Sequence, residues 1–213
     1  MSGNDEAGGA PPGSGAARGR GAEGGTARRI AAAAREILTD EGADAVSMRR
    51  VAEAVGVTPM AIYRHYPNRG ALLRSVADET LQELADRWRA NVTTSGFEER
   101  LDGLLAEFLD FALGHPHLYG FLMTDRWERA RRFPEDYADS GPPAFAEVTE
   151  LVRQAMGEGE LREDDPLEVA LTVTSHPQGL VQLYLAGRIG LPEPEFRALC
   201  HRSTWRVVNG IRA

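Results

Sequence analysis

The sequence predicts an all-α protein of about nine helices, in which a three-helix N-terminal unit precedes a larger helical body. Apolar residues recur at helical spacing along most of the 213 residues, and capping residues or prolines stand at the ends of these segments. No stretch alternates polar and apolar residues as a half-buried strand would, and no internal repeat is visible. We therefore expect three parts, at residues 1–25, 26–70 and 71–213.

Residues 1–25 consist mainly of Gly, Ala, Pro and Ser. Such a composition predicts a disordered tail, because it cannot bury enough apolar surface to offset the entropy cost of ordering. For Arg18 and Arg20 we favour a solvated tail over contact with a phosphate.

The first helix of the N-terminal unit is expected from Thr26 to about Glu41, where Gly42 ends it. Ser47 is a suitable N-cap for a second helix. Gly56 then permits a left-handed turn. The inward face of the second helix is expected to hold Met48, Val51, Ala52 and Val55.

A third helix is expected to open at Thr58-Pro59, with Thr as the N-cap and Pro at the first helical position. It should run to about Tyr66, because Pro67 pushes the preceding residue out of the helical region. Asn68 caps a long fourth helix. Its apolar stripe consists of Leu73, Val76, Ala77, Leu81, Leu84, Ala85 and Trp88.

The rest of the chain has the same helical periodicity. Residues 124–142 hold Pro, Gly and many charges, and we expect a mobile loop or a broken helix there. Pro177 should interrupt and kink the eighth helix, since proline lacks the amide hydrogen of the helical ladder. The fifth to ninth helices are expected at about 101–112, 116–123, 143–157, 166–187 and 193–210.

The second and third helices have the spacing of a helix-turn-helix, the motif that places its second helix in the major groove of DNA. The small Ala52 allows the two helices to approach closely. Gly56 makes the turn, and Val57 fills the angle between the helices. These features predict a DNA-binding unit.

The segment from Gly56 to Leu72 resembles the signature of the TetR/AcrR family of bacterial transcriptional regulators. It has the Gly-Val turn, then I-Y-R-H-Y, then N-R and A-L. The resemblance is strong over residues 26–75 and architectural beyond them. Arg69 replaces the usual Lys, and Gly70 stands where a non-glycine residue is common.

This resemblance implies a set of DNA contacts. Thr58, Met60, Ala61 and Arg64 would face the groove, and Arg64 is the best candidate for a bidentate contact with guanine. Other groups would meet phosphates. We expect Ile62 and Tyr66 to be core instead, and His65 considered alone would be structural. The predicted DNA-binding residues are Arg49, Thr58, Met60, Ala61, Tyr63, Arg64, His65 and Arg69.

The charge distribution fits one DNA-facing end. The chain carries a net charge of −8, and all 24 of its basic residues are arginine. Residues 26–70, however, hold seven arginines against five acidic residues. Duplex DNA should therefore approach the N-terminal unit and avoid the acidic body.

The resemblance also implies a homodimer, a palindromic operator, usually repression, and a ligand pocket in the body. Thr174 and Gln178 stand where a related C-terminal motif has Trp and His. For any single residue, ordinary core packing is the alternative to ligand contact. The predicted ligand-binding residues for a largely apolar effector are Trp88, Phe108, Phe111, Tyr119, Met123, Trp127, His176, Gln178 and Tyr184.

The last two long helices would form the dimer seam, or else ordinary core. Ligand binding would tilt the fourth helix through its contact with the sixth helix near His117 to Phe121. The proposed seam residues are Leu180, Val181, Leu183, Tyr184, Phe196, Leu199, Cys200, Val207 and Val208.

Two other classes of protein are considered. An enzyme could use His115, His117 and Asp110 at a metal site, but residues two apart do not share a helix face and no metal-binding motif is present. A ligand-binding protein with a vestigial DNA-binding unit is disfavoured by the intact signature. We expect no cofactor. One cysteine, Cys200, no apolar run of about 18 residues and no signal-peptide pattern predict a soluble cytoplasmic protein.

Overall fold

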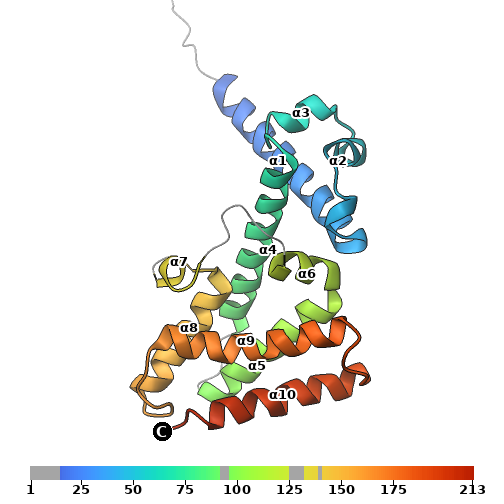
Figure 1. Cartoon of the computed structure of the whole chain (residues 1–213). Coiled ribbons are helices and arrows are strands. Elements are labelled where there is room, and N and C mark those ends of the chain that lie inside the picture. Colours follow the sequence, from blue (N-terminus) through green and yellow to red (C-terminus); the bar gives the residue numbers. More distant parts are fainter. Residues whose placement is uncertain (1–14, 92–95, 125–131, 139–140) are drawn as a thin grey trace, which may run out of the picture.

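The protein is all-α, as the sequence predicts. A computed structural model describes residues 15–91, 96–124, 132–138 and 141–213. Among these residues there are ten α-helices, one 3-10 helix and no strand (Figure 1). The helices are α1 (Gly15–Glu41), η1 (Ala43–Ala45), α2 (Met48–Val55), α3 (Pro59–Tyr63), α4 (Arg69–Asn91), α5 (Phe97–Gly114), α6 (Pro116–Thr124), α7 (Glu135–Ala138), α8 (Pro143–Gly157), α9 (Pro166–Leu185) and α10 (Glu193–Asn209).

Helices α1, η1, α2 and α3 form the head at one end of the molecule (Figure 1). The Ser47 side chain accepts a hydrogen bond from the Arg50 amide and starts α2, and Gly56 follows α2 in the left-handed conformation at φ 73°. Both features confirm the sequence prediction. The fully buried residues of the head are Ile30, Ala34, Leu38, Val51 and Ile62.

Helices α5 to α10 form the body, and α4 joins it to the head (Figure 1). The N-terminal part of α4 follows the head directly, and the helix packs against both α1 and α8. An ion pair between Arg35 of α1 and Glu83 of α4, at 2.6 Å, adds a polar link along this contact. Helix α4 thus packs against both the head and the body.

Four details differ from the sequence prediction. Helix α1 begins at Gly15, well before Thr26, because extending an existing helix avoids the cost of nucleation. A short 3-10 helix, η1, and the short α7 were not predicted individually. Helix α3 ends at Tyr63, since the amides of His65 and Tyr66 both turn back to the carbonyl of Ile62.

The prediction that Pro177 interrupts the eighth helix is wrong. Helix α9 runs through Pro177 without a break, and the proline ring is buried. The fixed φ of proline lies in the helical region, so the residue costs one amide donor but leaves the backbone path available.

No helix among the described residues has both the length and the apolar character needed to cross a lipid bilayer.

Candidate DNA-binding surface and ligand cavity

The helix-turn-helix has well-defined local geometry. The amide of Val57 bonds to the carbonyl of Ala52 at 3.0 Å, which closes the turn after α2. Thr58 caps α3 by accepting from the Ala61 amide at 3.3 Å, and Pro59 occupies the first turn. These contacts fix the direction in which the short α3 leaves α2.

Helix α3 has one buried side and one open side. Ile62 is fully buried and anchors the helix, while Met60 is 69% exposed and Tyr63 is 48% exposed. Thr58 and Arg64 are also exposed, and Ala61 is half-buried. An exposed Met and Tyr on a five-residue helix form a contact surface that the head itself does not use.

The arginines near this surface differ in how they are held. Arg64 caps the end of α3 and makes no hydrogen bond or ion pair with another described side chain. Arg49 pairs with Glu53 one turn along α2 at 2.9 Å, and both side chains are well exposed. An exposed pair of this kind is weak, so Arg49 can exchange its partner for a phosphate at little cost.

Arg69 has a structural role that the sequence did not reveal. Its Nε donates to the carbonyl of Val46 at 2.7 Å, and its Nη2 donates to the carbonyl of Ala43. The guanidinium therefore holds η1 and the chain leading into α2. A planar guanidinium has several N–H donors and can bond to two carbonyls at once. This accounts for Arg at a position where the resembled family usually has Lys.

The aromatic residues that follow Arg64 pack toward the head. His65 and Tyr66 are half-buried, and the Tyr66 hydroxyl donates to the carbonyl of Ala27 at 3.3 Å. Tyr66 is thus mostly packing, as expected.

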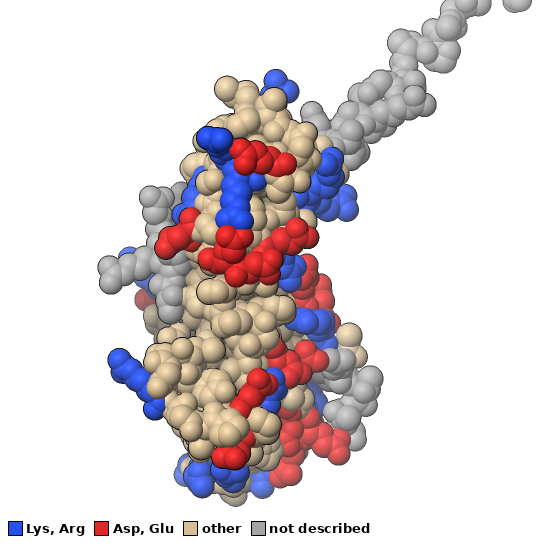
Figure 2. Space-filling model, turned by 90° about the vertical axis from the view of Figure 1, so that its right-hand side faces the viewer, with Lys and Arg blue, Asp and Glu red and all other residues tan. Residues whose placement is uncertain are grey.

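The charges at the head end are mixed on the one face that Figure 2 draws, where arginine and acidic side chains lie among one another. Two head arginines serve the fold, since Arg50 pairs with Glu41 and Arg29 donates to the carbonyl of Val55 at 2.9 Å. Glu41 in turn has a pKa lowered by its hydrogen bond from Arg50. Fewer arginines are available to DNA than the sequence count suggests.

The body contains a cavity of about 650 Å³, partly open to solvent, between α4, α5, α6, α7, α8 and α9. Five of the predicted ligand-binding residues line it: Trp88, Phe108, Phe111, Met123 and Gln178. The remaining lining residues are Arg74, Ala77, Asp78, Leu81, Leu84, Leu122, Tyr137, Pro142, Ala144, Phe145, Val148 and Thr174.

Sequence reasoning missed the polar residues of α4 and the wall that α8 contributes. Arg74 and Asp78 are separated by one helical turn from each other, and helical spacing from the apolar stripe could have placed them at its edge. Phe145 follows the proline-rich start of α8, where composition alone predicts a loop boundary.

Three predicted ligand residues lie elsewhere. Tyr119 is buried beside the cavity, with its hydroxyl donating to the carbonyl of Gln178 at 3.3 Å, and burial raises its pKa to about 12. His176 bonds to Ser203 at 2.7 Å. Tyr184 stacks on Phe196 with ring centroids 4.0 Å apart. Trp127 lies outside the described residues.

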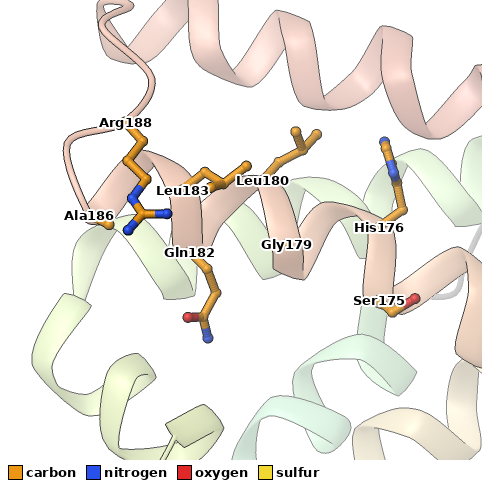
Figure 3. A pocket seen from close by; sticks show the side chains of 8 residues that line it. All are labelled: Ser175, His176, Gly179, Leu180, Gln182, Leu183, Ala186 and Arg188. Atoms are coloured by element: carbon orange, nitrogen blue, oxygen red, sulfur yellow. The ribbon is translucent and has the colours of Figure 1, made fainter.

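A second hollow, open to solvent, lies on α9 and the turn after it (Figure 3). His176, Leu180, Leu183 and Arg188 are among the side chains that border it. Three leucines on α9 are exposed by more than a third: Leu171, Leu183 and Leu185.

Much of the predicted dimer seam is instead the core of one protomer. Val181, Phe196, Cys200 and Val208 are fully buried, so they are not free to meet a second chain. The periodicity of α9 and α10 was correct, but it marks the faces that pack on each other and on α5.

No cluster of three potential metal ligands occurs within the part of the chain that the structure describes. His115 packs against Phe111 with ring centroids 6.1 Å apart, and His117 lies beside Gly42 of the head. Both histidines are exposed to solvent.

Comparisons with known proteins match both parts of the chain. Residues 30–76 match the model of bacterial regulatory proteins of the tetR family. Residues 101–204 match the model of the tetracyclin repressor-like C-terminal domain.

Curated relatives are HTH-type regulators. The chain is 32% identical to the transcriptional repressor DrrR1 of Streptomyces coeruleorubidus over 44% of its own length, but it spans only 34% of that protein. It is 28% identical to the uncharacterised regulator YdeS of Bacillus subtilis, over 75% of the chain and 79% of YdeS.

Solved structures with the same fold include a Rhodococcus protein of unknown function, with a TM-score of 0.71, 22% identity, and coverage of 88% of this chain and 96% of that one. Another is the transcriptional regulator FadR of Bacillus subtilis in complex with stearoyl-CoA, with a TM-score of 0.70, 17% identity, and coverage of 86% and 98%.

Proposed function

The chain belongs to the TetR family of bacterial regulatory proteins, and from this premise we propose that it is a dimeric repressor released from a palindromic operator by a largely apolar ligand. Transcriptional regulation and DNA binding follow from the family. The dimer, the form of the operator and the ligand are the proposed parts.

The exposed side of α3 is the main observation that supports DNA binding by these residues. Met60 and Tyr63 are exposed there while Ile62 anchors the helix, and Arg64 has no competing side-chain partner among the described residues. Arginine without an internal partner can make two hydrogen bonds to guanine. Arg49 and Tyr63 would supply phosphate contacts, which position the head without reading sequence.

A dimer through α9 is supported by its exposed leucines. Leu183 is 41% exposed and borders the solvent-open hollow on α9 together with Leu180 and Ala186, and a second copy of the same helix would cover this face. A two-fold arrangement then presents two heads to two half-sites about one helical turn of DNA apart, or a small multiple of it.

Release by a ligand is supported by the path from the cavity to the head. Helix α4 lines the cavity with Arg74 and Trp88 and begins directly after the head. Helix α6 lines it with Leu122 and Met123, but packs against α1 and η1 of the head, where His117 lies beside Gly42. We therefore propose that ligand binding moves α6 against η1 of the head, in addition to tilting α4.

The structure of the FadR complex bears on the ligand only by analogy. That regulator binds stearoyl-CoA, and its fold is shared at low identity. For this chain, the aromatic and aliphatic lining of the cavity supports a largely apolar ligand. A regulator without any effector is the alternative. An enzyme is disfavoured because the described lining residues include no nucleophile beside a base.

The test begins with DNA fragments selected by the purified protein from a random pool. The expected product is an inverted repeat, with symmetric footprints and affinity that falls steeply with salt. Asymmetric protection, or binding that ignores salt, would contradict the proposal. Thermal-shift screening of apolar compounds then tests the cavity, and release of the selected DNA by a stabilising compound tests the regulation.

A further inference from the structure

Beside the cavity, one buried donor has no partner among the described residues. Trp88 is 6% exposed and lines the cavity from α4. Its indole nitrogen is sealed from solvent and makes no hydrogen bond with any described residue. A buried donor without a partner costs about 1–3 kcal/mol, so a ligand that brings an acceptor recovers this loss.

The cavity is also long. Arg74 and Trp88 both line it from α4, and at a rise of 1.5 Å per residue their Cα atoms lie about 21 Å apart along the helix. A volume of about 650 Å³ distributed over that length is narrow. It suits an elongated ligand more than a compact one.

The charge near the two ends differs. Arg74 and Asp78 stand together at the end of the cavity nearest the head. Among the described residues that line the cavity, none near Trp88 is a cation. Of the two arginines that flank Trp88 on α4, Arg87 is exposed to solvent, and Arg89 is held by Glu147 at 2.5 Å and by Asp86 at 2.7 Å. A carboxylate at Trp88 would therefore be buried without a counter-ion, which is costly.

Resting on the function proposed above, we propose that the effector is an elongated, mainly apolar molecule with a neutral carbonyl oxygen that accepts a hydrogen bond from the Trp88 indole. Apolar side chains along the wall, such as Leu81, Phe108 and Val148, hold the chain of the ligand. Since the nitrogen is covered in the ligand-free protein, binding displaces the group that covers it.

The test uses three probes of matched size: 2-tridecanone, its analogue 2-methyl-1-tridecene with carbon in place of the carbonyl oxygen, and dodecanoate. Each competes with the neutral dye N-phenyl-1-naphthylamine for the full-length protein. We expect the ketone to bind about twofold to tenfold more tightly than the alkene, the range of one net hydrogen bond. We expect dodecanoate to bind more weakly than the ketone.

The variant Trp88→Phe keeps an aromatic ring and removes the donor. It should abolish the preference for the ketone while still binding the alkene. Phe111→Leu is the matched control, because it alters the apolar wall and should weaken both probes while leaving their ratio unchanged.

A second measurement needs no variant. In protein with ¹⁵N-labelled tryptophan, three indole signals are expected from the three tryptophans. The ketone should shift one of them downfield, and the alkene should not.

The outcomes separate the two proposals. If no probe competes with the dye and none shifts an indole signal, the apolar cavity ligand of the proposed function fails. If the probes bind but the ketone has no advantage, or keeps it in Trp88→Phe, only the acceptor at Trp88 is overturned. Tighter binding of dodecanoate than of the ketone would overturn the neutral oxygen if Trp88→Phe removes that advantage. An advantage that survives in Trp88→Phe would place the carboxylate at Arg74 and would overturn the expected weaker binding of dodecanoate.

Discussion

At the scale of single residues, some arginines of the head stabilise the fold and others are available for the proposed DNA contacts. Arg69 is bound to two carbonyls and Arg50 to Glu41, whereas Arg64 has no such side-chain partner among the described residues. Replacing an arginine should therefore affect stability at Arg69 and Arg50, but DNA binding at Arg64.

Replacing Arg64 by Ala should relax sequence preference at one base pair per half-site. A bidentate contact with guanine discriminates by about 1–3 kcal/mol, so affinity for the selected site should fall roughly 5- to 150-fold and affinity for random DNA much less. Gel shifts on both DNAs measure the difference. Tyr63→Phe is the control, and it should weaken binding to both DNAs about equally; the reverse pattern would exclude Arg64 as the base-reading residue.

Replacing Arg69 by Ala should destabilise the head. The change removes donors to the carbonyls of Val46 and Ala43, and a loss of about one net hydrogen bond lowers Tm by about 2–4 °C. Arg69→Lys should lie between the variant and wild type. Unchanged melting in Arg69→Ala would mean that these bonds do not stabilise the protein and that the residue is free for phosphate.

Gly42 is a further sensitive residue. It has φ +87°, and an added Cβ would lie 3.5 Å from Nδ1 of His117. The contact is ordinary, but with ψ 173° the backbone lies in an extended, positive-φ region that is essentially confined to glycine, and it costs a residue with a Cβ about 1–3 kcal/mol. Gly42→Ala should therefore lower the free energy of unfolding by that amount in urea titration, whereas Gly157→Ala, within the regular end of α8, should not.

Among the elements, α2 and α3 depend on their N-caps because they are short. An eight-residue and a five-residue helix cannot persist on propensity alone. Their caps at Ser47 and Thr58 and their buried contacts therefore determine whether the DNA-facing surface exists.

Ser47→Ala should cost about 1 kcal/mol, the usual value of an N-cap. Ser75→Ala is the matched control, since the Ser75 hydroxyl bonds to Glu79 on the exposed side of α4. Hydrogen exchange of the α2 amides should rise in the first variant and stay unchanged in the second. Equal protection in both would show that packing alone holds α2.

At the scale of the whole molecule, the body is proposed to set the distance between two heads. Leu183 is 41% exposed on α9, and a charge there would be buried in the proposed interface without a partner. Leu183→Glu should therefore yield monomers in light scattering, and it should weaken binding to the full operator far more than binding to a half-site, because the heads are no longer linked.

Met60→Glu is the control for this variant. Met60 is 69% exposed in the head, so the change should impair DNA binding and leave the oligomeric state intact. A dimer that persists in Leu183→Glu would place the interface elsewhere.

The sequence by itself determined the fold class, most helix ends, the turn at Gly56 and the inward face of α2. These features are local: caps, prolines and helical periodicity act within a few residues and can be seen without knowing the partner of each face. The aromatic content of α4 and α5 likewise indicated residues that line the cavity, such as Trp88 and Phe111.

Only the tertiary structure decided which partner each side chain has. It assigned Arg69 to carbonyls, Tyr184 to Phe196 and His176 to Ser203, and it turned part of the expected dimer seam into protomer core. It also left the Trp88 indole without a partner in the described part of the chain. Periodicity specifies that a face is buried, but the contact that buries it joins residues far apart in the chain, and their meeting depends on how whole helices pack.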